Sequence, residues 1–322
     1  DELAQAMHAA PDGAMASHAT LAAVDRQRQL EQFNAPLPAL DVSLTVHGVF
    51  ARQVRHSPDA AAVIDGAVRW SYADLDQRAR RIAARLVAEG VAPGERVGLL
   101  MERSAPALAC VLGVLQAGAA YVPIQPDYPG ERIAFMLRDA GIRVLLVSHE
   151  VEQSGIVPAG VRALAVEKLL AQDAGNADTT ALPSVDTQAP AYVMYTSGST
   201  GLPKGIEICH RSVLRLVIEP NFLRMQAGDR VLHAAPLGFD AATLEIWGPL
   251  LAGGCCVVHD EKVPTGPGLA RTISAHEVRT AWLTAALFNA VIDDDPLHLQ
   301  GLSQLLAGGE ALSVPHVRRA MA

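Results

Sequence analysis

The stretch Tyr195-Thr196-Ser197-Gly198-Ser199-Thr200-Gly201-Leu202-Pro203-Lys204-Gly205 is the most informative part of this chain. It interleaves four hydroxyl side chains with glycines, and one lysine stands near its end. The residues before it, 191–195, are apolar and β-prone, so we expect the loop to leave the end of a strand. Glycines let successive backbone N–H groups converge on an anion, and hydroxyl and ammonium groups add donors suited to phosphate oxygens. The stretch therefore predicts a loop that binds a polyphosphate.

This stretch has two alternative interpretations. The Walker pattern has a glycine, four residues, and then Gly-Lys-Ser/Thr; counted from Gly198, the chain has Pro203 at the second glycine and Gly205 at the Ser/Thr. A solvated turn rich in glycine and serine is the other alternative, in which Lys204 is an ordinary loop lysine. The order of hydroxyls, glycines, proline and lysine favours phosphate binding over both.

The stretch resembles the phosphate loop of the adenylate-forming superfamily, Tyr-Thr-Ser-Gly-Ser/Thr-Thr-Gly-x-Pro-Lys-Gly, and matches it throughout. Further stretches resemble motifs of adenylation domains of nonribosomal peptide synthetases: Trp70-Ser71-Tyr72-Ala73-Asp74-Leu75, Leu115-Gln116-Ala117-Gly118-Ala119-Ala120-Tyr121-Val122-Pro123-Ile124 and Phe239-Asp240-Ala241-Ala242. Departures from the family pattern are Gln116, Gln125 and Ala242, all outside the phosphate loop.

The expected fold is α/β, with alternating βα units that form mostly parallel sheets covered by helices. Strand-like runs such as 144–147 alternate with helical patterns such as Tyr72–Glu89, which favours this class. The resemblance implies that residues 46–322 are the large N-terminal subdomain of an adenylation domain, incomplete and without its C-terminal lid. Residues 1–45 would be the linker from a preceding condensation domain. We expect 148–190 to be a loop-rich crossing between two sheet units, the phosphate loop opening the second.

Composition excludes several classes of protein. The 322 residues are half apolar with a net charge of −8 and no Lys/Arg block, which argues against a nucleic-acid-binding surface. The apolar run 106–124 is interrupted by Gly118 and Pro123, so we expect a buried helix followed by a strand and no membrane span.

The four cysteines and the start of the chain bear on its compartment. Cys110, Cys209, Cys255 and Cys256 lack metal-binding spacing, so we expect buried thiols in a reducing cytosol. The chain starts without a basic leader, which favours a cytoplasmic protein.

The resemblance implies a reaction between ATP, with Mg²⁺, and an amino acid. The amino-acid carboxylate attacks the α-phosphorus and gives an aminoacyl-adenylate plus pyrophosphate, for later loading as a thioester on the phosphopantetheine of a downstream carrier domain. Charge that develops on phosphoryl oxygens calls for positive and N–H-rich surroundings. The phosphate-binding candidates are Thr196, Ser197, Gly198, Ser199, Thr200, Gly201 and Lys204. Residues 307–312 resemble the family's Ala-Gly-Gly-Glu segment, in which a glycine turn lets a flat base approach the backbone. The resemblance implies that Gly308, Gly309, Glu310 and Ala311 lie beside the nucleotide.

Asp240 is the candidate partner of the substrate ammonium group. It lies in the apolar stretch 237–241, where an unpaired carboxylate is costly and an ammonium is a fitting partner. The alternative is a helix N-cap for residues 241–251. The resemblance implies a substrate pocket formed by Phe239, Asp240, Ala241, Leu244, Leu283, Leu306 and Gly308. Its apolar lining favours an aliphatic or otherwise uncharged amino acid, although these leucines could equally belong to the core.

No catalytic residue and no metal ligand is assigned within the chain. An ionised carboxylate needs no base to attack phosphorus, so we interpret His233 as at most a pocket wall and Glu245 as a structural partner. In the family the adenine, Mg²⁺, ribose and lid motifs follow the position of Ala322, so we expect little turnover from this stretch alone. Two alternatives remain: an acyl- or aryl-acid ligase of the same superfamily, and a truncated non-catalytic module.

Overall fold

The computed structural model describes residues 8, 22–32, 43–171, 183–196 and 202–321. The chain divides into two units, residues 1–41 and 42–322. In the first unit, helix α2 (Ala23–Gln27) continues into the π-helical turn η2 (Arg28–Gln32), and all of their side chains are exposed. The described part of this unit is therefore helical but buries no side chain.

The second unit contains two six-stranded sheets, here called sheet A and sheet B. Sheet A has the order β12-β11-β9-β10-β1-β2, and sheet B has the order β6-β5-β3-β4-β7-β8. The strands of sheet A are β1 (Ala61–Asp65), β2 (Val68–Ser71), β9 (Arg230–His233), β10 (Cys255–Val258), β11 (Thr280–Thr284) and β12 (Gln304–Gly308). Those of sheet B are β3 (Arg96–Leu100), β4 (Ala120–Ile124), β5 (Val144–Val147), β6 (Arg162–Ala165), β7 (Pro190–Thr196) and β8 (Lys204–Cys209).

Neighbouring strands are parallel except at β1–β2 and β7–β8. The helices of this unit are α3 (Val46–His56), α4 (Tyr72–Ala88), α5 (Ala105–Gln116), α6 (Gly130–Asp139), α7 (His149–Ser154), α8 (Val166–Ala171), α9 (His210–Val217), α10 (Ala241–Ala252), α11 (Gly266–His276), α12 (Ala285–Asp294), η4 (Pro296–Leu299) and α13 (Val314–Met321). The predicted α/β class with mostly parallel, helix-covered sheets is confirmed.

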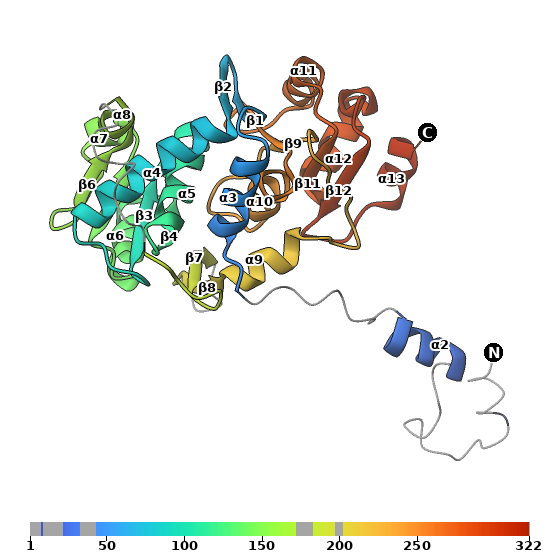
Figure 1. Cartoon of the computed structure of the whole chain (residues 1–322). Helices are drawn as coiled ribbons and strands as arrows, with labels where there is room; N and C mark the ends of the chain where they lie inside the picture. Colours follow the sequence, from blue (N-terminus) through green and yellow to red (C-terminus); the bar gives the residue numbers. More distant parts are fainter. Residues whose placement is uncertain (1–7, 9–21, 33–42, 172–182, 197–201, 322) are drawn as a thin grey trace. The chain divides into compact units, whose positions relative to one another are not determined.

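Helices fill the space between the two sheets and cover their outer faces (Figure 1). Helix α10 packs on β9, β10 and β11 of sheet A, and its Trp247 Nε1 donates to the hydroxyl of Tyr121 on β4 of sheet B, at 3.4 Å. Helices α11 and α12 cover the outer face of sheet A, and α6 covers that of sheet B. Every residue of α10 from Ala241 to Leu251 is buried, as expected for a helix that is apolar on most of its surface, and Thr243 and Glu245 are its buried polar residues.

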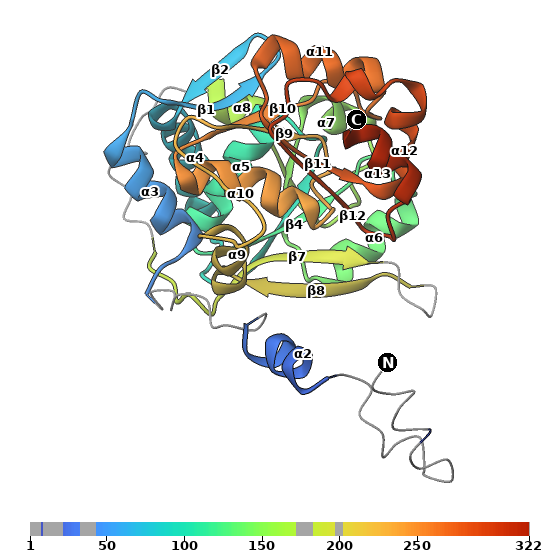
Figure 2. The same cartoon turned by 90° about the vertical axis from the view of Figure 1, so that its right-hand side faces the viewer.

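The phosphate-loop hairpin belongs to sheet B, which corrects the predicted order of the sheet units. Strand β7 pairs with β4, and β8 folds back on β7 to form the edge of the same sheet (Figure 2). The early strands β1 and β2 instead join sheet A, far along the chain from β9 and β10. The expectation that 148–190 is loop-rich is also wrong in part, because α7, β6 and α8 lie within it.

The apolar run 106–124 forms α5 and β4, so the prediction of a helix followed by a strand is confirmed. In the described parts of the chain, no helix is long and apolar enough to cross a membrane. All four cysteines are free; Cys110, Cys255 and Cys256 are buried as predicted, but Cys209 is partly exposed. The prediction is wrong at Cys209 because β8 is an edge strand that only β7 covers.

Candidate active site

Several of the predicted site residues that the structure describes lie near the ends of parallel strands. Strands β9, β11 and β12 of sheet A end at His233, Thr284 and Gly308. The loop after β9 approaches the end of β4 in sheet B, because a Cβ on Gly238 would lie 3.7 Å from the carbonyl oxygen of Pro123. Strand β7 runs parallel to β4, so the phosphate loop leaves sheet B at this same edge. Ligands of open α/β sheets bind outside the carboxyl ends of the strands.

The phosphate loop joins β7 to β8. Thr196 ends β7 and pairs with Lys204 at the start of β8, and both side chains are exposed. The strand predicted before the loop is thus confirmed. The remaining candidates lie outside the described residues: Ser197, Gly198, Ser199, Thr200 and Gly201.

Tyr195 anchors the strand that carries the phosphate loop. Its hydroxyl donates to Oδ2 of Asp139 on α6 at 2.6 Å. Burial raises the pKa of Tyr195, and the hydrogen bond and the Asp139 charge act in the same direction. Tyr195 therefore remains a neutral donor that fixes β7 against α6 at the base of the loop.

Asp240 directly precedes α10, but its carboxylate does not cap the helix. Its backbone is helical (φ −63°, ψ −26°), and its side chain makes no capping hydrogen bond. Capping geometry uses a β-region backbone at this position, so the cap interpretation is wrong. The expected apolar surroundings are also wrong, since Asp240 is exposed and Phe239 is 51% exposed. Within the described residues, the Asp240 carboxylate has no ion pair, which leaves it available to a ligand.

Tyr192 places Asp240 close to sheet B. Its hydroxyl accepts a hydrogen bond of 3.1 Å from Oγ1 of Thr243, in the first turn of α10. Burial raises the pKa of Tyr192, and the negative charge of Asp240 adds to this shift. Tyr192 is absent from the residues predicted from the sequence, because nothing in β7 alone indicates which helix its hydroxyl meets.

Four of the predicted pocket residues lie on α10 and on β12 of sheet A. Ala241 and Leu244 lie in the first turns of α10 and are buried, while Leu306 and Gly308 on β12 are half-buried. Helix α10 packs on β9, β10 and β11 of sheet A, and β12 pairs with β11, so both pairs remain pocket candidates.

Leu283 lies on the opposite face of sheet A and corrects the predicted pocket. It is 1% exposed and packs in the core formed with α11 and α12, among Leu269, Ile273 and Phe288. Side chains alternate along a strand, so a shift of one residue reverses the face. The inner-face residue is Trp282, which pairs with Leu306 and whose Nε1 lies 3.9 Å from a Cβ built on Gly308. Ala281 and Leu283 are both buried on one face of β11, so the residue between them, Trp282, points to the other face. This alternation was the sequence signal that could have identified Trp282.

The segment predicted beside the nucleotide begins at the end of β12. Gly308 closes the strand, and Gly309 adopts φ +89°, which favours glycine. Glu310 and Ala311 follow and are exposed. The expected glycine turn is therefore present at the strand edge.

Two histidines that could be mistaken for general bases are both buried. Nδ1 of His210 accepts the backbone N–H of Val46 at 3.3 Å. Burial, together with nearby His47, lowers the pKa of His210 to about 3. His233 is fully buried against Glu245 and does not form an exposed pocket wall.

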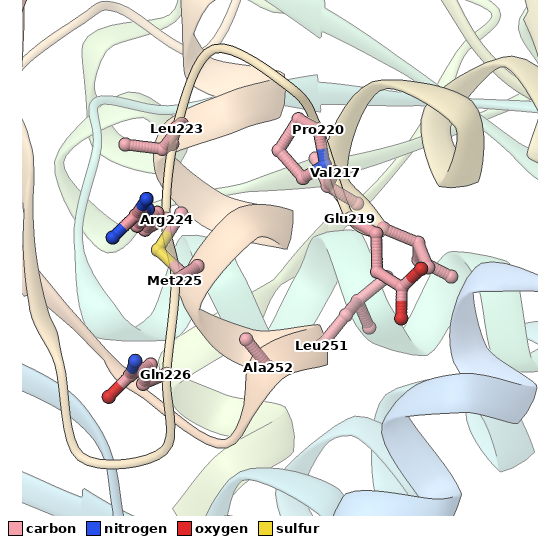
Figure 3. A pocket seen from close by; sticks show the side chains of 10 residues that line it. Val217, Glu219, Pro220, Leu223, Arg224, Met225, Gln226, Leu251 and Ala252 are labelled. Carbon is pink, nitrogen blue, oxygen red and sulfur yellow. The ribbon is translucent and has the colours of Figure 1, made fainter. Parts of the chain in front are cut away.

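One hollow of the described surface lies away from these residues. It has a volume of ≈ 470 Å³ and is formed by the segment after α9 and the end of α10 (Figure 3). Its lining residues are Val217, Ile218, Glu219, Pro220, Leu223, Arg224, Met225, Gln226, Leu251 and Ala252. Asp240 and this hollow are at opposite ends of α10, about 16 Å apart at 1.5 Å rise per residue. We therefore place the site by strand ends and not by this hollow.

A family model described as AMP-binding enzyme matches residues 50–322. The chain belongs to the AMP-binding enzyme family. Among its relatives, one of the linear gramicidin synthase proteins of Brevibacillus parabrevis is 40% identical over 326 residues, which cover 99% of this chain and 6% of that protein. Surfactin synthase subunit 2 of Bacillus subtilis is 35% identical and covers 98% of this chain and 9% of its own length. The AMP-binding chain thus spans less than a tenth of these two relatives.

Solved structures agree with this assignment. Holo-PA1221, an NRPS protein containing adenylation and PCP domains, is 36% identical with a TM-score of 0.80, covering 88% of this chain and 48% of its own. The N-terminal subdomain of Klebsiella oxytoca NpsA, in complex with 3-hydroxybenzoyl-AMSN, is 26% identical with a TM-score of 0.80, covering 88% and 71%. The resemblance to adenylation domains of nonribosomal peptide synthetases is confirmed for this AMP-binding chain.

Proposed function

We propose that this AMP-binding chain holds ATP and an amino acid while they react to an aminoacyl-adenylate and pyrophosphate within a nonribosomal peptide synthetase. The observation that carries the amino-acid part is Asp240. Its carboxylate is exposed, unpaired among the described residues, and located where α10 begins beside the strand ends. A charge-assisted hydrogen bond to an α-ammonium group fits such a carboxylate.

The pocket residues would receive the side chain of the amino acid. We assign this role to Ala241, Leu244, Trp282, Leu306 and Gly308, with Trp282 replacing Leu283 because of the strand register. All are uncharged, so burial of an ionised side chain against them would be costly. An aliphatic or otherwise uncharged amino acid is the expected substrate.

The phosphate loop would hold ATP opposite this pocket. Exposed Thr196 and Lys204 at its two ends supply a hydroxyl and an ammonium group, and Gly309 supplies a turn at the neighbouring strand end. On the basis of the sequence alone, we also assign phosphate binding, through hydrogen-bond donors, to Ser197, Gly198, Ser199, Thr200 and Gly201. A carboxylate oxygen of the amino acid forms a bond to the α-phosphorus, and the bond between the α-phosphorus and the leaving pyrophosphate oxygen breaks. No proton needs to leave, because the carboxylate is already ionised.

The remaining parts of the proposal concern cofactors and partners. Mg²⁺ would neutralise phosphate charge when ATP is bound; in the described ranges no group of three or more His, Cys, Asp or Glu side chains could hold a metal by itself. A carrier domain bearing phosphopantetheine would accept the aminoacyl group. Residues 1–45 would form the linker to a condensation domain and 46–322 the large subdomain. A cytoplasmic location stays a prediction.

An aryl-acid ligase is the second candidate. The NpsA subdomain forms complexes with 3-hydroxyanthranilyl-AMSN and 3-hydroxybenzoyl-AMSN, at 26% identity to this chain. Asp240 argues against that substrate class here, because a substrate without an α-amine would leave this carboxylate without a partner.

The substitution Asp240→Ala tests the proposal in the complete synthetase that carries this chain. We expect the KM for the amino acid to rise at least about tenfold, since a hydrogen bond between charged groups is worth about 1.5–3 kcal/mol. The KM for ATP should stay within about twofold. Asp59→Ala removes another exposed carboxylate and is the control. Equal losses for both substrates in amino-acid-dependent pyrophosphate exchange would rule out the assigned role.

A further inference from the structure

Glu245 on α10 is a buried residue, and one of its two carboxylate oxygens accepts three hydrogen bonds. It is 1% exposed, and its Oε2 accepts from Nδ1 of His233 at 2.8 Å. The same oxygen accepts the backbone N–H groups of Ala234 at 3.1 Å and Ala235 at 3.0 Å. Hydrogen bonds to an ionised acceptor are roughly twice as strong as neutral ones, so this contact is strong and geometrically defined.

These donors begin the segment that leads to Asp240. Strand β9 ends at His233, and residues 234–240 connect it to α10. Glu245 lies one turn after Ala241 on that helix, so its carboxylate ties the helix back to the start of its own connecting segment. Asp240, Ala241 and Leu244 therefore all lie in the short stretch of chain between Ala234 and Glu245, whose two ends are joined by this hydrogen bond.

Two further polar atoms show that packing alone does not explain why Glu245 and His233 are buried together. Glu245 Oε1 and His233 Nε2 are buried and have no hydrogen-bond partner among the described residues. Burial lowers the pKa of Arg103, and the Glu245 charge partly opposes that shift. A buried ionic group is commonly no more stabilising than apolar residues of the same volume. Leu232 on β9 and Ala234 just after it pack in an apolar core. The surroundings therefore accept apolar side chains, and burial does not by itself require an ionic group here.

We propose that Glu245 is a positioning residue for the amino-acid pocket. Its carboxylate holds residues 234–240 against α10, and thereby fixes the Asp240 carboxylate relative to Ala241 and Leu244. The inference deepens the proposed function and rests on it. Thr196 and Lys204, the described ends of the phosphate loop, lie on sheet B and are not among the hydrogen-bond partners of Glu245, so ATP binding should be independent of Glu245.

The test compares Glu245→Gln and Glu245→Ala in the complete synthetase, with L-valine, L-isoleucine and L-leucine as probes. Glutamine keeps the shape and one neutral acceptor, so we expect the amino-acid KM to rise about three- to tenfold. Alanine leaves three buried donors without an acceptor and should raise it more than tenfold, or prevent folding. The KM for ATP should stay within about twofold in every folded variant. Pyrophosphate exchange and thermal unfolding are measured together.

Thr272→Val is the matched control. It removes a comparably buried hydrogen bond between the Thr272 hydroxyl and Nδ1 of His259, 2.9 Å apart, on the other side of sheet A. We expect it to lower the melting temperature without separating the two KM values. A wild-type amino-acid KM in Glu245→Gln, or parallel rises of both KM values, would overturn the positioning role. Asp240→Ala distinguishes the two proposals: if it raises the amino-acid KM while Glu245→Gln does not, only the positioning role is wrong.

Discussion

Trp282 and Leu283 show how much a single position decides at the scale of the residue. Both are large and apolar, and resemblance to the family motif assigned the pocket to Leu283. In the structure Leu283 packs under α11 and α12, whereas Trp282 faces Leu306 and Gly308. Here the resemblance identified the correct strand, but a shift of one residue along a strand moves the side chain to the opposite face of the sheet.

Substitutions at these two positions should therefore have different effects. Trp282→Ala enlarges the proposed pocket, so we expect exchange activity to shift toward larger amino acids. Leu283→Ala removes buried core volume and should cost about 2–5 kcal/mol of unfolding free energy without changing the preferred substrate. Pyrophosphate exchange over an amino-acid panel, with urea denaturation, measures both. A changed substrate preference in Leu283→Ala would contradict the register assignment.

The partly buried His47 and the buried His210 predict a pH dependence of stability. Burial lowers the pKa of His47 to about 4 and, with His47 nearby, that of His210 to about 3. In the unfolded chain both lie near 6.5, so the unfolded state binds more protons below that pH. Stability should be fully present above pH 7 and fall as the pH drops, by about 1.4 kcal/mol per histidine between pH 7.5 and 5.5. Urea denaturation at both values tests this, and His210→Asn should reduce the difference; equal stability at both pH values would refute it.

At the scale of the element, local periodicity predicted more than topology. The spacing of Leu75, Ala79, Ile82 and Leu86 predicts α4, and the structure buries all four. The split of the apolar run into α5 and β4 was equally readable, because Gly118 interrupts it with φ +75°. The membership of β1 and β2 in sheet A was not readable, since strand pairing across such a separation has no local signal.

Helices α4 and α5 approach each other so closely at Gly113 that the position requires glycine. A Cβ there would lie 2.7 Å from the carbonyl oxygen of Ala79 and 2.8 Å from Cβ of Ile82, so the helices pack through this site. Gly113→Ala should destabilise the fold by about 1–3 kcal/mol through overpacking. Gly130→Ala, at the first residue of α6 with no atom within 4 Å, should stay within about 0.5 kcal/mol. Similar denaturation midpoints for the two variants would contradict this packing.

At the scale of the whole molecule, two sheets bring together residues that are distant in the chain. Sheet A carries the proposed amino-acid pocket on β11 and β12, and sheet B carries the phosphate loop between β7 and β8. Helix α10 contacts both sheets and begins at Asp240. Motif resemblance predicted these parts separately, but only the assembled sheets show that their strand ends meet at one edge. The contacts of Tyr192 with α10 and of Glu245 with residues 233–235 are apparent only in the assembled molecule.

The central claim is that Asp240 recognises the α-ammonium group of an amino acid. The most direct measurement pairs L-leucine with 4-methylpentanoic acid, which lacks only that ammonium group, in exchange assays of wild type and Asp240→Ala in the complete synthetase. We predict that the wild-type enzyme prefers L-leucine by at least about tenfold in kcat/KM, and that Asp240→Ala largely removes this preference. An undiminished preference in Asp240→Ala would contradict the claim.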